Sequence, residues 1–137
     1  MPGFGDLKMA EAPSSRSFDK AKFGKYLRDN ALPPFGAGKC AAYVRQALEA
    51  GGLTTGGHPL CAKDYGPFLQ TRLFRVVTLT PEVGDIAVFQ AVPRISTAGH
   101  IEGWDGRNWI SDFIQDDIYP SRAYKAANAS YAIYRRY

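Results

Sequence analysis

The spacing of apolar residues changes once along the chain, from a helical interval in the first half to short strands in the second. The clearest helical stripe is formed by Cys40, Val44, Ala47 and Leu48, which lie on one face of a helix. Glycine occupies positions 51–52, where such a helix would stop. We therefore predict a helix that begins at Cys40 and buries this stripe.

Two further helices are predicted beside this one. Ser17 is a typical N-cap, and the apolar residues that follow it predict a helix through Asp29. The segment after that helix contains Pro33-Pro34 and two glycines, which is typical of a loop. A short helix is also predicted within residues 62–73, although Gly66-Pro67 must interrupt or restart it.

The second half of the chain predicts a sheet of about five strands, at residues 74–79, 84–89, 99–104, 108–113 and 131–135. Asp105-Gly106 lies between the third and fourth strands and is a strong hairpin signal. A turn centred on these two residues would place His100 opposite Ser111, whereas a bulge or a longer turn would bring Asp112 onto the face of His100. Because helices precede an antiparallel sheet, the predicted fold class is α+β.

The composition supports a globular protein. The chain has 137 residues, of which 45% are hydrophobic and 22% are charged, and this apolar content suffices for a single core. Residues 1–16 are rich in Gly, Pro, Ser and Ala. We therefore expect a flexible N-terminal arm over residues 1–16 and one domain over residues 17–137.

Charge and hydropathy argue against several classes of partner. The net charge of +4 is dispersed, with Arg135-Arg136 as the only adjacent basic pair, so no nucleic-acid partner is expected. A mildly basic protein would suit an anionic polymer such as a cell wall. No apolar run approaches the ~18 residues of a membrane span. The N-terminal residues lack the pattern of a signal peptide, so export would use another route.

The two cysteines and two histidines do not form a recognisable metal motif. No pair among them has the short ligand spacing of a structural zinc site, so we expect no metal and no organic cofactor. The segment Gly36-Ala37-Gly38-Lys39 lacks the full spacing of a phosphate-binding loop. Cys40 and Cys61 could pair, and the sequence leaves this disulfide open.

A glycine-bearing loop, residues 35–39, runs directly into the helix that Cys40 begins. Backbone N–H groups at a helix start lack internal partners, and the helix dipole adds partial positive charge there. Both effects favour a thiolate, which is the nucleophilic form of cysteine. A cysteine on an apolar helix face is, however, as often buried packing as a nucleophile.

A nucleophilic cysteine needs a general base, and the chain offers two histidines. His58 lies in a loop of Thr, Gly and Pro, where a solvated side chain is expected. His100 begins a predicted strand directly after Gly99, and a strand can hold an imidazole against the start of a facing helix. Asp112 is the candidate that orients this imidazole, and Glu102, on the same strand face as His100, is the alternative.

Candidate substrate-binding residues surround these positions: Gly38, Tyr43, Gly99, Trp109 and Gln115. Gly99 would leave room for a substrate backbone beside the imidazole. Trp109 suits a hydrophobic core as well as a groove, and a histidine in a strand is often a structural group. The residues alone therefore leave both a catalytic and a structural interpretation open.

Taken in order, residues 38–44, 83–89 and 98–101 resemble the NlpC/P60 and CHAP group of papain-like cysteine peptidases. In that group a cysteine begins a helix that packs on an antiparallel sheet, and a Gly-His strand carries the base. The resemblance implies that Cys40 is the nucleophile, His100 the base and Asp112 the third residue. Because the segment after the histidine departs from the usual pattern, Glu102 stays the alternative.

The small size and the lack of a signal peptide or wall-binding module also look similar to the amidase effectors of type VI secretion systems. This resemblance implies a peptidoglycan amidase or endopeptidase that cuts the murein peptide stem in the periplasm or wall of a target bacterium. It further implies a monomer, with peptidoglycan and a cognate immunity protein as partners. The alternatives are an acyltransferase or transpeptidase with the same Cys–His couple, and a non-catalytic wall-binding module.

Overall fold

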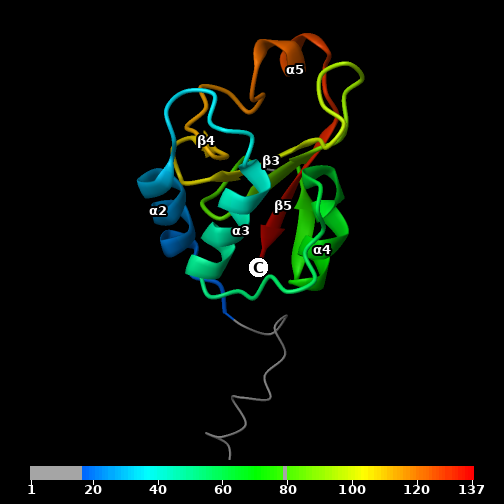
Figure 1. The fold of residues 1–137 in the computed structure, drawn as a ribbon. Helices are drawn as coiled ribbons and strands as arrows, with labels where there is room; N and C mark the ends of the chain where they lie inside the picture. The colour runs from blue at the N-terminus through cyan, green and yellow to red at the C-terminus, as the bar shows by residue number, and fades with distance from the viewer. Residues whose placement is uncertain (1–16, 79) are drawn as a thin grey trace, which may run out of the picture.

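The chain begins with helices and ends with a sheet in the computed structural model, which describes residues 17–78 and 80–137 (Figure 1). The helical elements are α2 (Lys20–Asn30), α3 (Cys40–Ala50), the 3-10 turn η3 (Ala62–Asp64), α4 (Tyr65–Thr71) and α5 (Arg122–Ala126). The strands are β1 (Phe74–Val77), β2 (Ile86–Phe89), β3 (His100–Trp104), β4 (Trp109–Ile110) and β5 (Tyr131–Arg136). The predicted arm over residues 1–16 lies outside the described residues, as does Leu79 at the end of the first predicted strand.

The structure confirms the helix at Cys40 and corrects the cap of the helix before it. α3 begins at Cys40, as the apolar spacing predicts. α2 is capped by Asp19, whose carboxylate accepts the N–H of Lys22 at 3.0 Å, so the predicted cap at Ser17 is wrong. Gly66-Pro67 lie in the first turn of α4, where the missing N–H of proline needs no partner.

The strands form one five-stranded sheet in the order β1-β5-β2-β3-β4, and every pairing is antiparallel. This confirms the predicted α+β class and the antiparallel sheet. α3 packs against both α2 and β3, so the start of α3 lies at the end of the sheet where β3 begins. β5, the last strand in the chain, lies between β1 and β2, so the C-terminal segment is an inner strand of the sheet.

The hairpin between β3 and β4 has a longer turn than its sequence suggests. Trp104 pairs with Trp109, so the turn contains residues 105–108 rather than Asp105-Gly106 alone. The Asp105 carboxylate accepts the backbone N–H groups of residues 107 and 108, at 2.8 and 2.7 Å, and stabilises this wider turn. The register therefore differs from the one expected.

The strand after the hairpin is short, and the chain turns back directly after it. β4 ends at Ile110, which forms an antiparallel bridge with Ile114, and the N–H of Ser111 donates to the carbonyl of Phe113 at 3.1 Å. Asp112 therefore lies in a turn and not on a strand beside His100. His100 and Glu102, two residues apart in β3, share one face of the sheet.

Apolar side chains fill both faces of the sheet. The larger core lies between the sheet and the helices α2, α3 and α4, and it includes Phe23, Val44 and Ile101. A smaller cluster on the other face contains Phe89, Trp109 and Tyr124. At Gly103 of β3, an added Cβ would meet the Phe23 ring, so glycine at this position lets α2 approach the strand closely.

A buried ion pair fixes the start of β2 to the C-terminal strand. Asp85, which follows Gly84, accepts two hydrogen bonds from the Arg135 guanidinium of β5, at 2.9 and 2.8 Å. The Gly-Asp motif before β2 therefore has a structural role, because it ties two neighbouring strands together.

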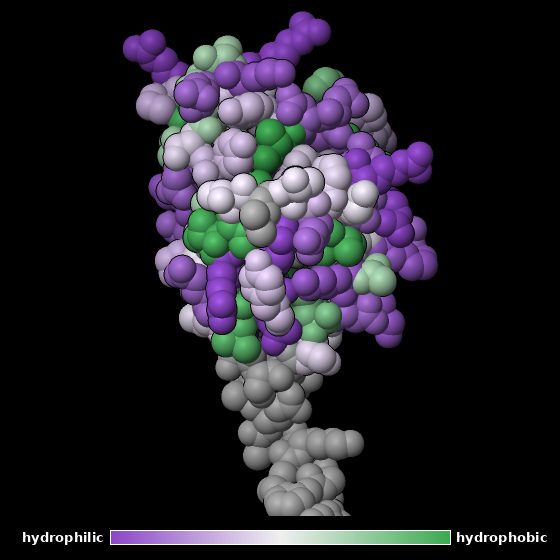
Figure 2. All heavy atoms as spheres, turned by 180° about the vertical axis from the view of Figure 1, so that it is seen from behind, coloured by the Kyte–Doolittle hydropathy of each residue, from purple (hydrophilic) through white to green (hydrophobic). Residues whose placement is uncertain are grey.

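The outer surface shows no single large apolar area on the side opposite Figure 1. Seen from behind, hydrophobic residues form small patches that polar residues separate (Figure 2). Within residues 17–78 and 80–137, no helix has the length and apolar character needed to cross a membrane.

Candidate active site

Cys40 lies where the start of α3 meets a cavity. The N-cap, Lys39, makes no side-chain hydrogen bond to the helix, so the first turn of α3 is not capped by that side chain. Cys40 is half-buried and packs against the main core. It also lines a cavity of about 650 Å³, together with Gly38 and His100. A thiol in this position is accessible to a ligand and faces the positive end of a helix dipole.

His100 connects this thiol to buried polar groups behind it. The imidazole is 8% exposed and lines the same cavity as Cys40. Its Nε2 atom lies 3.0 Å from Oε1 of Gln115 and 3.1 Å from Oε1 of Glu102. Since Nε2 faces these two side chains, Nδ1 is the nitrogen left for Cys40.

Gln115 determines the tautomer of the imidazole. Its Nε2 donates to Glu102 Oε1 at 2.9 Å and to the backbone carbonyls of residues 117 and 118, at 3.0 and 3.3 Å. With the amide nitrogen directed at these acceptors, the Gln115 oxygen faces His100 and must accept its hydrogen bond. His100 therefore keeps a proton on Nε2, and Nδ1 is the nitrogen that exchanges a proton with the Cys40 thiol.

The two ionisable groups behind Cys40 have shifted pKa values. Burial lowers the pKa of His100, but hydrogen bonds to Cys40 and Glu102 outweigh it and raise that pKa to about 10. Burial raises the pKa of the fully enclosed Glu102 to about 7, although its hydrogen bond to His100 opposes the rise. Such shifts concentrate at sites that move protons.

These shifts predict how stability depends on pH. A group whose pKa is raised on folding contributes less to the free energy of unfolding as pH rises from its unfolded to its folded pKa. For Glu102 this window runs from 4.5 to about 7, and for His100 from 6.5 to about 10. Glu102→Gln removes the first titration. We expect the free energy of unfolding of this variant minus that of the wild type, measured in urea, to rise by about 2 kcal/mol from about pH 5 to about pH 8. A difference that stays constant over this range would contradict the assignment.

Asp112 holds the loop before Cys40 and does not contact the imidazole. Its Oδ2 accepts the N–H groups of Ala37 and Lys39, at 2.7 and 2.9 Å. A Cβ at Gly36, whose φ is +59°, would overlap the carboxylate, so glycine is required there. The prediction that Asp112 orients His100 finds no contact among the described residues, because the imidazole meets Gln115 and Glu102 while the Asp112 carboxylate meets the loop.

The candidate substrate-binding residues separate into two groups. Gly38 and Gly99 line the cavity beside Cys40. Tyr43 and Trp109 are not among the described residues that line it, and the Trp109 ring instead packs on Trp104 at 5.2 Å. Gln115 is buried behind His100 and supports the imidazole, and it lines a neighbouring cavity rather than the one that contains Cys40. The structure therefore brings Gly38 and Gly99 to Cys40 and does not bring Tyr43, Trp109 or Gln115 to the wall of that cavity.

Sequence reasoning missed the rest of the cavity wall. One side is formed by the loop from His58 to Leu60, and another by Pro120 and Ser121 before α5. A neighbouring cavity of about 420 Å³ shares four residues with the first: Phe35, Phe113, Pro120 and Ser121. These residues come from distant segments that only the fold brings together. In the sequence, the one signal for this part of the wall was the position of Phe35 beside Gly36.

The two cysteines, Cys40 and Cys61, are both free thiols in this structure. In the described part of the chain, no group of three or more His, Cys, Asp or Glu residues is arranged to hold a metal ion.

Two solved structures are similar to this chain over most of its length. The first is the native complex of the type VI effector Tae3 with the immunity protein Tai3 from Ralstonia pickettii, with a TM-score of 0.82 and 37% identity over 88% of this chain and 100% of that chain. The second is the selenomethionine form of that complex, with a TM-score of 0.78 and 38% identity over 83% of this chain and 99% of that chain. No protein-family model matches the chain, and no curated protein matches it.

Proposed function

Because this chain belongs to the family of the type VI effector Tae3, we propose that it is an antibacterial effector that hydrolyses an amide bond in the peptide stem of peptidoglycan. The observation that carries the proposal is that Cys40 and His100 line the wall of one cavity, with the thiol among the groups that raise the pKa of the imidazole. Gln115 and Glu102 complete the site in place of Asp112. This arrangement supports the resemblance to papain-like NlpC/P60 and CHAP peptidases.

The proposed reaction proceeds through a thioester. The raised pKa of His100 favours the state in which Nδ1 already holds the thiol proton, and the Cys40 thiolate attacks the amide carbonyl carbon. The imidazolium then donates this proton to the nitrogen of the leaving amine, and the C–N bond breaks. Water, deprotonated by His100, attacks the thioester, which releases the acid and restores the thiol. Gln115 and Glu102 keep the imidazole in one orientation throughout.

The backbone around Cys40 supplies a donor for the tetrahedral intermediate. The N–H groups of Ala37 and Lys39 already donate to Asp112. The N–H of Cys40, at the start of α3, is the group that would donate to the oxyanion, and the helix dipole adds to its effect. Asp112 therefore contributes indirectly, since it fixes the loop that places this N–H.

The proposed setting of the activity follows from the family. Tae3 was solved in complex with an immunity protein. We expect a cognate immunity protein to bind this chain over the cavity and block it. We also expect the chain to act as a monomer, in the periplasm or wall of a target bacterium.

Product analysis distinguishes hydrolysis from acyl transfer by the same residues. Purified sacculi would be incubated with the wild type and with His100→Ala under reducing conditions, and the released fragments resolved by mass. Hydrolysis predicts new free amino and carboxyl ends, formed by the wild type only. Joined stems would indicate a transferase, and unchanged sacculi of several wall types would contradict the proposed activity.

A further inference from the structure

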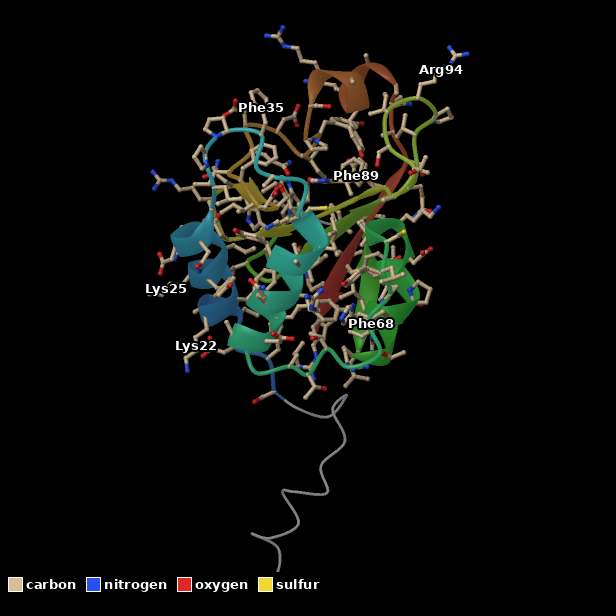
Figure 3. All side chains as sticks on the ribbon, in the orientation of Figure 1. Lys22, Lys25, Phe35, Phe68, Phe89 and Arg94 are labelled. Atoms are coloured by element: carbon tan, nitrogen blue, oxygen red, sulfur yellow. The ribbon has the colours of Figure 1, made fainter. Side chains whose placement is uncertain are left out.

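We propose that Phe35 is a substrate-binding residue whose ring contacts the apolar C–H groups of a peptidoglycan fragment lying across both cavities. This inference rests on the proposed function and adds a specificity-determining residue to it. Phe35 belongs to the loop between α2 and α3, and Figure 3 shows it at the end of the molecule where α5 lies. Its side chain is 79% exposed, which is unusual for an aromatic residue.

The backbone of Phe35 is in a conformation that bulky residues rarely adopt. Its φ is +70°, in the left-handed region that favours glycine. Burial does not explain this conformation, because most of the ring is in solvent and its aromatic neighbour, Phe113, is 6.2 Å away between ring centroids. Strained residues that gain no packing are concentrated at functional sites.

Contacts on the following residues hold Phe35 in place. Asp112 binds the N–H groups of Ala37 and Lys39, and its carboxylate occupies the space that a side chain at position 36 would need. The N–H of Gly36 also donates to the carbonyl of Pro33 at 3.0 Å. The backbone is therefore fixed on both sides of the strained residue, which limits the positions that the exposed ring can take before any ligand arrives.

Phe35 lies at the boundary between the two cavities. Phe35 lines the cavity of about 650 Å³ that contains Cys40 and His100, and it also lines the neighbouring cavity of about 420 Å³. A ligand that extends from the thiol into the second cavity would cross the boundary that Phe35 shares with Phe113, Pro120 and Ser121. The face of an aromatic ring packs well on the C–H groups of a sugar or of an aliphatic side chain. A peptidoglycan fragment offers both of these groups.

Two substitutions at Phe35 and a matched control test the inference. Phe35→Ala and Phe35→Gly should each raise KM for a soluble muropeptide about tenfold and leave kcat within about twofold, since they remove binding and not chemistry. Phe35→Gly should also keep or raise Tm, because glycine relieves the positive φ. Leu73 has a φ of +69° and is 52% exposed, but it lies between α4 and β1. Leu73→Gly should therefore also keep or raise Tm, and it should leave KM and kcat unchanged.

A second readout separates binding from damage to the loop. The rate at which iodoacetamide alkylates Cys40 should be the same in wild type and in both Phe35 variants. A fall in Tm together with slower alkylation would show that Phe35 only supports the loop, and it would overturn the inference. An unchanged KM in a folded variant would overturn it as well.

The inference can fail separately from the proposed function. The affinity of Cys40→Ala for a muropeptide, measured by calorimetry with and without Phe35→Gly, needs no catalysis. A loss of about tenfold in affinity supports the inference even if the wild type cleaves nothing, whereas equal affinities, or no binding, overturn it. Comparing a free stem peptide with a disaccharide-bearing one then shows which group the ring contacts: a loss with both indicates the peptide, and a loss confined to the second indicates the sugar.

Discussion

Cys40→Ala should lower the rate of sacculus hydrolysis by at least about 10⁴-fold, because alanine cannot form the thioester intermediate. The folded structure should persist, since the side chain is half-buried and alanine suits a helix. The rate would be measured from fragments released by purified sacculi with reductant present.

Cys61 provides a matched control for this prediction. It is the other cysteine of the chain, and it is likewise free and half-buried. Cys61→Ala should retain activity within about twofold of wild type. Full activity in Cys40→Ala, or loss of activity in Cys61→Ala alone, would contradict the assignment of the nucleophile.

Gln115→Leu should lower kcat by about 10²-fold and leave KM nearly unchanged, because the residue orients His100 and is only 2% exposed. Leucine has a similar volume but removes the oxygen that accepts from Nε2 and the amide that binds Glu102. The imidazole then loses the partner that fixes its tautomer. A change in the pH profile of Cys40 alkylation should accompany the loss, and a purely structural role would not produce this change.

Asp112→Asn tests whether Asp112 or Gln115 orients His100. Its side-chain oxygen can still accept the N–H groups of Ala37 and Lys39, so the loop before Cys40 should keep its position. We expect a loss of less than about tenfold in kcat. If this variant lost more activity than Gln115→Leu at equal Tm, the Cys-His-Asp arrangement first predicted from the sequence would be favoured instead.

Local patterns predicted much of the fold. The helix at Cys40 follows from one apolar stripe and a glycine stop, and the five strands follow from short β-rich runs between turn signals. Strand order was not readable from these patterns, because the place of β5 between β1 and β2 depends on long-range pairing. The register of β3 and β4 was missed because the Asp105 side chain stabilises a turn of four residues, an effect outside the usual two-residue hairpin signal.

The site was predictable only as far as its residues lie on regular elements. Cys40 at a helix start and His100 at a strand start could be paired, and the structure brings them together. Gln115 follows an irregular segment in which the chain turns back after β4, so no periodicity could assign its role. The expectation of a type VI effector rested on overall architecture, and the similarity to Tae3 supports it at the level of the family.

The most direct test of the central claim is to trap the covalent intermediate. Wild-type protein would be mixed with a purified muropeptide, quenched in acid within the first turnovers, and examined by intact-mass and peptide-mass spectrometry. The account predicts an acyl adduct on the peptide that contains Cys40, absent from Cys40→Ala. An adduct on another residue, or product formation by Cys40→Ala at the wild-type rate, would contradict it.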